Sequence, residues 1–106
     1  MANLKTVVLS KLREHMEELR KFGVKRIGLF GSYARDEQDE ESDVDLVVEF
    51  EEGEATLDNF LGLVEYLEVL LGRRVDLITV EGLRHIRIAH VREEIEGNVL
   101  YIQEGD

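Results

Sequence analysis

The stretch VKRIGLFGSYARDEQDEESDVDLVVEF, residues 24–50, contains two apolar segments separated by a polar and strongly acidic one. The first apolar segment, 24–30, predicts a strand that becomes fully apolar at its end. The second, 44–50, predicts another strand of similar length. Between them we expect a short helical turn over 33–37 and a charged loop over 38–42. A strand, a tight turn and a second strand therefore form the centre of the predicted fold.

The flanking sequence continues the alternation of helices and strands. Apolar residues recur every three or four positions over 4–22 and over 57–71, which is typical of amphipathic helices. Gly23 and Gly72 follow these segments as stop signals, and Thr56 precedes the second as an N-cap. The remaining expected elements are a strand over 74–79, a last helix over 83–95 and a final strand over 99–102. The order α-β-α-β-α-β-α-β predicts an α/β (α+β) fold with a single mixed sheet of about four strands covered by helices. We expect one domain over residues 1–106.

Composition limits the kinds of partner. The chain has 13 basic and 24 acidic residues, a net charge of −11 and no cysteine. We expect no extensive nucleic-acid surface, because such surfaces depend on many Lys and Arg side chains. A nucleotide bridged by cations, or a basic protein, remains compatible with this charge. The polar start does not resemble a secretory signal, and no apolar run reaches the ~20 residues that span a bilayer. We therefore predict a cytoplasmic protein without a membrane partner.

Three aspartates stand on or beside the predicted strands. Asp43 and Asp45 are one residue apart at the start of strand 44–50, so both carboxylates point to the same face, about 7 Å apart along the backbone. Each raises the pKa of the other, and a divalent cation such as Mg²⁺ relieves their repulsion. If strand 74–79 lies beside this strand, Asp76 joins them, and three carboxylates can hold two magnesium ions about 4 Å apart. The alternatives are a solvated strand end and an edge-strand aspartate that faces water.

A glycine–serine pair marks a second candidate site. Gly31 and Ser32 follow strand 24–30 and lead into the short helical turn. Glycine lets the backbone approach a ligand closely, and a helix N-terminus offers N–H groups to phosphate. The Ser32 hydroxyl adds a donor, and Arg35 could reach a phosphate or anchor the acidic loop. The alternative is an ordinary turn, which such a pair forms in most proteins.

In combination, these residues resemble the signature of the polymerase-beta-like nucleotidyltransferases, and more closely that of the minimal nucleotidyltransferase (MNT) subfamily. The signature consists of Gly31-Ser32-Tyr33-Ala34-Arg35, a spacer, Ser42-Asp43-Val44-Asp45-Leu46, and Asp76 one helix and one strand later. The resemblance covers nearly the whole chain and implies the nucleotidyltransferase fold.

The resemblance also implies roles for the site residues. The glycine–serine pair, with Arg35, would bind the nucleotide phosphates. Asp43 and Asp45 would ligate two Mg²⁺ ions, and Asp76 would ligate the catalytic one and help to activate the acceptor hydroxyl. The reaction would transfer AMP from ATP and release pyrophosphate.

The acceptor is a further implication of the resemblance. Larger relatives carry an extra helical domain that binds the acceptor, and we expect none here. Small members resemble the antitoxin of HEPN/MNT toxin–antitoxin pairs, which implies a helical HEPN ribonuclease toxin as partner and one of its tyrosines as acceptor. Two alternatives stay open: an antitoxin that acts by docking without catalysis, and a nucleotidyltransferase that modifies a small molecule. The intact set of acids favours catalysis, and the missing acceptor domain disfavours a small-molecule acceptor.

Two further features have simpler interpretations. His85 and His90 are five residues apart, whereas zinc ligands on one helix are usually spaced by three or four, so we expect no zinc site there. The apolar stripe over 57–71 is mainly core. Its leftover apolar positions could form a face for a partner or for a homo-oligomer.

Overall fold

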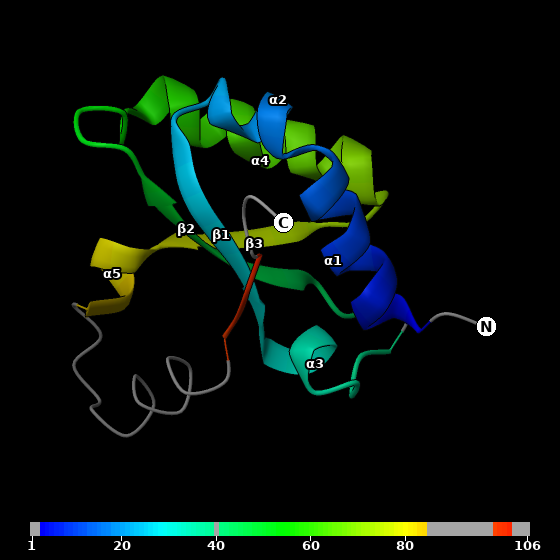
Figure 1. Cartoon of the computed structure of the whole chain (residues 1–106). Coiled ribbons are helices and arrows are strands. Elements are labelled where there is room, and N and C mark those ends of the chain that lie inside the picture. Colours follow the sequence, from blue (N-terminus) through cyan, green and yellow to red (C-terminus); the bar gives the residue numbers. More distant parts are fainter. Residues whose placement is uncertain (1–2, 40, 85–98, 103–106) are drawn as a thin grey trace.

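The sheet is mixed, as the sequence predicts. The computed structural model describes residues 3–39, 41–84 and 99–102, and within them four strands form one sheet in the order β3-β2-β1-β4 (Figure 1). The strands are β1 (Val24–Phe30), β2 (Val44–Phe50), β3 (Val75–Thr79) and β4 (Leu100–Tyr101). β1 is antiparallel to both β2 and β4, whereas β2 and β3 are parallel. This parallel pair is joined by the helix α4 (Leu57–Leu71), because parallel neighbours need a crossover connection.

Both ends of α4 follow the sequence signals. The Thr56 hydroxyl accepts a hydrogen bond from the backbone N–H of Asn59 at 3.1 Å, so this residue is the predicted N-cap. Gly72 ends the helix in the left-handed conformation, with φ +66°. The helix is thus held between its expected first and last residues.

The predicted helix over 4–22 is divided in two, so that expectation was wrong. α1 (Leu4–Glu14) and α2 (Met16–Arg20) meet at His15, where φ is −111° and ψ is 19°. The backbone N–H of His15 is shared between the carbonyls of Lys11 and Leu12, at 3.2 and 3.3 Å. The apolar series continues through this break, so the spacing of residues alone did not reveal it.

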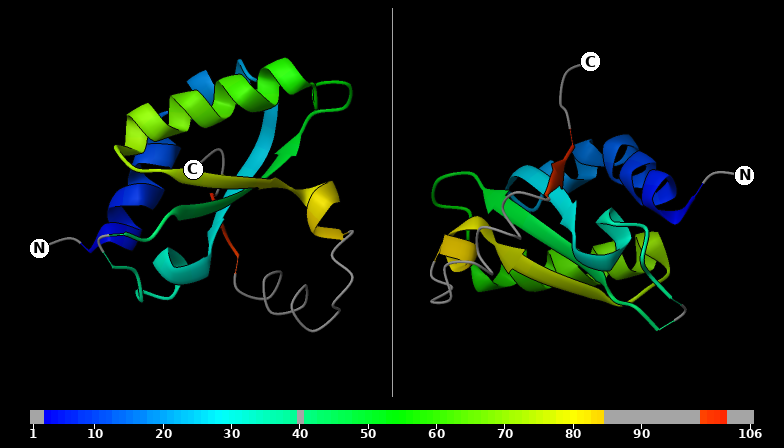
Figure 2. Two further views of the ribbon diagram at one scale, coloured as in Figure 1. Left: turned by 180° about the vertical axis from the view of Figure 1, so that it is seen from behind. Right: turned by 90° about the horizontal axis from the view of Figure 1, so that it is seen from below.

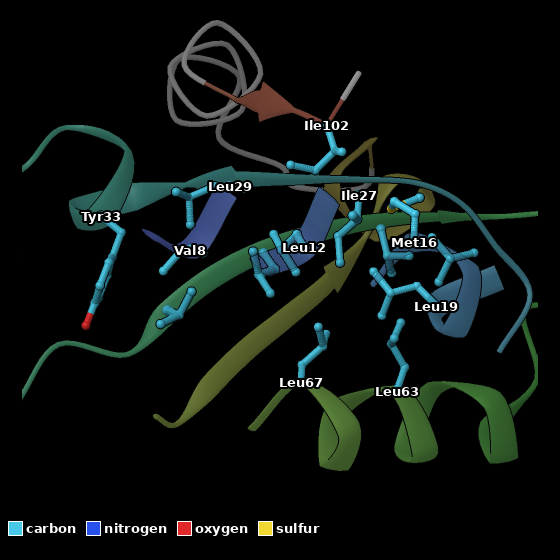
Figure 3. Close-up of a cluster of buried hydrophobic side chains, with 14 residues drawn as sticks. Val8, Leu12, Met16, Leu19, Ile27, Leu29, Tyr33, Leu63, Leu67 and Ile102 are labelled. Atoms are coloured by element: carbon cyan, nitrogen blue, oxygen red, sulfur yellow. The ribbon is translucent and has the colours of Figure 1, made fainter. Parts of the chain in front are cut away.

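One main core lies between the helices and the sheet. Figure 1 shows α1, α2 and α4 gathered along the sheet, and Figure 3 shows Leu63 and Leu67 pointing from α4 towards the side chains of α1, α2 and β1. Both leucines are fully buried, as are Leu12, Leu19 and Ile27 opposite them. Burial of apolar surface contributes about 25 cal/mol per Å², so this layer is the main source of stability.

The other face of the sheet carries a smaller apolar cluster. Val47 of β2 lies there with Val80 and Leu83 of the helix α5 (Val80–Arg84). Figure 2 shows that α5 follows the end of β3 and that α3 (Gly31–Ala34) follows the end of β1. Because most of the helices cover the first face, this second face is the side on which polar strand residues can contact a ligand.

Several boundaries differ from the sequence prediction. α3 begins at Gly31 and not at residue 33. β3 and β4 are shorter at their ends than predicted, as strand ends often are. The last helix starts at Val80 and not at residue 83. The rest of that predicted helix, with His85 and His90, lies outside the described residues.

None of the helices in the described part of the chain is long and apolar enough to cross a membrane.

Candidate active site

Asp43 and Asp45 lie at the start of β2, on the face opposite the main core. Val44 and Leu46 are fully buried in that core, so the alternation of side chains directs Asp45 to the other face. Asp45 is half-buried, whereas Asp43, one residue before the strand, is exposed. The predicted geometry of an aspartate pair at the mouth of a strand is therefore present.

Asp76 lies directly beside Asp45. The parallel register pairs Val44 with Val75 and Asp45 with Asp76, so two aspartates occupy the same level of neighbouring strands. The sequence interpretation required β3 to lie next to β2, and the sheet order meets that condition. Within the described residues β3 is an edge strand, and Asp76 is exposed along that edge.

Gly31 brings the other candidate element against the same carboxylate. Phe30, the residue before it, pairs with Asp45 across β1 and β2. Gly31 has φ +73°, and a Cβ atom at this position would collide with the Asp45 carboxyl group. Glycine is therefore required twice, by the left-handed backbone and by the close approach. Ser32 is half-buried beside it, and its backbone carbonyl accepts from the N–H of Glu37 at 2.8 Å.

Arg35 is tied to the acidic loop. Its Nε donates to Oε2 of Glu37 at 3.1 Å, and the side chain is about half exposed. Of the two roles that the sequence left open, anchoring the loop is the one present in this structure. Arg35 is nevertheless close enough to Asp45 to lower the pKa of that carboxyl group.

Burial and two neighbouring carboxylates change the pKa of Asp45. Its pKa is raised from 3.8 to about 6, first by burial, then by the charge of Asp76, then by that of Asp43, while Arg35 lowers it. Strong perturbation by burial and by neighbouring charges of the same sign is common at functional sites, because catalysis and ligand binding require such environments. A divalent cation would stabilise the ionised form that this environment disfavours.

Comparisons with known proteins identify the family of the chain. Residues 9–102 match the family described as the nucleotidyltransferase domain. The chain belongs to that family. It is 54% identical over 76 residues to the protein adenylyltransferase MntA of Thermococcus cleftensis, a match that covers 71% of this chain and 76% of the relative.

Two solved structures support the same fold. A structure described as an inferred minimal nucleotidyltransferase is 37% identical, with a TM-score of 0.70 over 93% of this chain and 95% of that one. A chain from the complex of a tri-AMPylated Shewanella oneidensis HEPN toxin with MNT antitoxin has a TM-score of 0.58 over 92% of this chain and 73% of that one. The latter is only 17% identical, so it bears on the fold alone.

The three candidate carboxylates, Asp43, Asp45 and Asp76, do not by themselves form a ready-made metal cage. Among the described residues, no three His, Asp or Glu side chains are close enough to form a complete metal site. Mg²⁺ usually takes one or two carboxylates and completes its shell with water and phosphate oxygens. Asp45, crowded by two like charges, provides the kind of ligand that such an ion requires. The nucleotide phosphates would supply the missing oxygens.

The sequence interpretation did not include a hollow beside Asp43. It has a volume of about 320 Å³ and is lined by Glu41, Ser42, Asp43, Gly72, Arg73 and Arg74. The signal was available, since Arg74 is two residues before Asp76, on the same face by strand alternation. A larger hollow of about 380 Å³ lies at the other end of β2, and no predicted site residue lines it.

Proposed function

We propose that this nucleotidyltransferase domain transfers AMP from ATP to a tyrosine hydroxyl of a HEPN-type toxin, and that this transfer neutralises the toxin. One observation carries the proposal. Two residues far apart in sequence lie beside Asp45: Asp76 is its partner on β3, and Gly31 lies against its carboxyl group. The name of the Thermococcus relative supports adenylyl transfer to a protein. The choice of a HEPN-type partner comes from the resemblance of the sequence signature to the antitoxins of HEPN/MNT pairs.

In this proposal, each residue has a defined task. Asp43 and Asp45 would hold the magnesium ions, and Asp76 would be a further ligand. Bound Mg²⁺ supplies charge stabilisation at the phosphate and lowers the pKa of an attacking hydroxyl. Gly31 and Ser32 offer backbone N–H groups and a hydroxyl to the nucleotide phosphates. α3 has only four residues and a weak dipole, so close backbone approach matters more than the helix itself.

The bonds made and broken follow from this placement. The acceptor oxygen attacks the α-phosphorus of ATP, and the bond from that phosphorus to pyrophosphate breaks on the opposite side. Asp76, exposed at the edge of the sheet, would accept the hydroxyl proton. Arg35 would exchange its contact with Glu37 for the phosphates as the nucleotide enters.

The test is transfer of label from α-labelled ATP, with magnesium, to the product of the neighbouring gene, which the proposal takes to be the HEPN-type toxin. Wild type is compared with an Asp43→Asn/Asp45→Asn variant. A matched control, Asp58→Asn/Glu65→Gln, removes two exposed charges from α4 instead. We expect label on the toxin with wild type and with the control, and none with the site variant.

Other outcomes separate the alternatives. If the site variant neutralises the toxin fully and wild type transfers no label, the protein is a docking antitoxin. If label appears on a small molecule such as an aminoglycoside but never on protein, the acceptor class is wrong. Either result would overturn the proposal.

A further inference from the structure

Arg74 is placed beside the candidate site by the same register that places Asp76. The backbone N–H of Val44 donates to the carbonyl of Arg74 at 2.9 Å. Val44 itself is paired with Val75, the residue after Arg74. Continuing this register one step back sets Arg74 beside Asp43, as Asp76 is set beside Asp45. Arg74 and Asp43 also line the hollow of about 320 Å³ described above.

The charge of Arg74 is not used within the described part of the chain. Its side chain is exposed, and no ion pair joins it to a described residue. The cation that lowers the pKa of Asp45 is Arg35, on the other side of the site. Arg74 is therefore available to a ligand in the hollow.

The strand order separates two sides of the site. Gly31 approaches Asp45 from the β1 side, whereas Asp76 and Arg74 lie on the β3 side, at the edge of the sheet. In-line displacement places the attacking and leaving oxygens on opposite sides of the phosphorus. If the phosphates of the nucleotide lie by Gly31, the acceptor hydroxyl must enter from the β3 side, next to the hollow.

We propose that the hollow binds a carboxylate side chain adjacent to the acceptor hydroxyl, and that Arg74 determines this specificity. The inference rests on the proposed function, because it takes the β3 side as the acceptor side. Arg73, Glu41 and Asp43 also line the hollow, so groups of both charges surround it. In a chain of net charge −11, an acidic acceptor is repelled over most of the surface, so the positive charge of Arg74 at the hollow can select its orientation.

Short synthetic peptides provide the probe. A central tyrosine is flanked by Asp, by Asn or by Lys, and binding is measured by fluorescence anisotropy with Mg²⁺ and a non-hydrolysable ATP analogue present. Wild type should bind the Asp-flanked peptide about fivefold more tightly than the Asn-flanked one, the upper range for an exposed ion pair. Arg74→Gln should remove this preference, and Arg74→Glu should prefer the Lys-flanked peptide.

The control is Arg13→Glu, the same charge change at an exposed position of α1. It should keep the preference of wild type. Equal binding of the Asp and Asn peptides by wild type, no saturable binding of any peptide, or a preference that survives Arg74→Gln would overturn the inference. A reversed preference in Arg74→Glu excludes a merely structural role, because misfolding would weaken binding of all three peptides.

Transfer from α-labelled ATP to the same peptides distinguishes this inference from the proposed function. If the peptides bind with the expected preference but receive no label, the proposed function is what has failed. If they receive label without any effect of the flanking charge on KM, adenylyl transfer stands and the role of Arg74 is wrong.

Discussion

Gly31 is constrained both by its own backbone conformation and by the residue that lies against it. Its backbone has φ +73°, and a Cβ atom there would collide with the Asp45 carboxyl group. Gly31→Ala should therefore displace Asp45 as well as strain the backbone. We expect transfer activity to fall by about a hundredfold, since small misplacements of reacting groups have effects of this size. The measurement is kcat/KM for labelled ATP with the toxin as acceptor.

A second glycine allows the effect of backbone strain to be measured without that of a steric collision. Gly53 has a similar φ of +81°, but nothing lies within 4 Å of the position that its Cβ would take. Gly53→Ala should cost about 1 kcal/mol of stability and leave transfer unchanged. An equal loss of activity in both variants would show that general destabilisation, not the position of Asp45, is responsible.

Asp45 should make the metal-free protein less stable as the pH rises. Its pKa is about 6 in the folded state against an ordinary 3.8, so the folded state binds more protons between these values. The stabilisation by protonated Asp45 is complete below about pH 4 and is lost as the pH rises through 6. Asp45→Asn should therefore be more stable than wild type at neutral pH by about 1 kcal/mol, a value reduced for solvent screening.

Urea unfolding in EDTA across this pH range measures the effect. The two proteins should converge in acid and separate above pH 6, and magnesium should restore wild type because a cation stabilises the ionised carboxylate. Asp58→Asn, an exposed aspartate of α4, should show no such gain. A constant difference between wild type and Asp45→Asn at every pH would contradict the raised pKa.

At the scale of elements, local sequence signals predicted the ends of α4, whereas the pairing of distant strands could not be predicted from the sequence. Thr56 and Gly72 set the ends of α4 through contacts within a few residues, so its boundaries could be predicted. The break at His15 depends on backbone angles that the apolar spacing does not encode. The pairing of Asp45 with Asp76 joins residues separated by a whole helix, so the sequence could only state it as a condition.

The same distinction explains which site residues were found. Asp43 and Asp45 belong together by strand alternation alone, which is local. The approach of Gly31 to Asp45 and the hollow beside Arg74 arise from strand pairing, which the sequence does not specify. Local patterns left the roles of Asp76 and of the glycine–serine pair ambiguous. The resemblance to a known family suggested a role for each of them.

The two faces of α4 should respond differently to mutation. Leu67 is fully buried against the sheet, whereas Val69, two residues later, is 85% exposed. Leu67→Ala should lower the free energy of unfolding by about 2–5 kcal/mol, through lost burial and a cavity. Val69→Ala should change it by less than about 0.5 kcal/mol. Urea unfolding of the two variants checks this, and a comparable loss in Val69→Ala would place that side chain in an interface.

On the scale of the whole molecule, the net charge of −11 makes cations a general stabilising factor. Ion pairs among the described residues, such as Lys5–Asp36, Arg26–Glu49 and Arg35–Glu37, each use one basic residue and therefore leave the acidic surplus of 11 charges in place. Salt of any kind should therefore raise the thermal midpoint by screening repulsion between carboxylates. This general effect must be separated from binding at Asp43 and Asp45.

Magnesium should raise the thermal midpoint more than sodium does at matched ionic strength. A ligand at tenfold excess over its Kd stabilises the folded state by about 1.4 kcal/mol, which corresponds to about 6 °C for a domain of this size. In the Asp43→Asn/Asp45→Asn variant this extra shift should disappear while the sodium effect remains, because only the specific ligands have been removed. In Asp58→Asn/Glu65→Gln, which loses the same amount of charge from α4, both effects should remain. If all three proteins gained equally from magnesium, its effect would be screening alone, and these aspartates would not form a metal site in the absence of nucleotide.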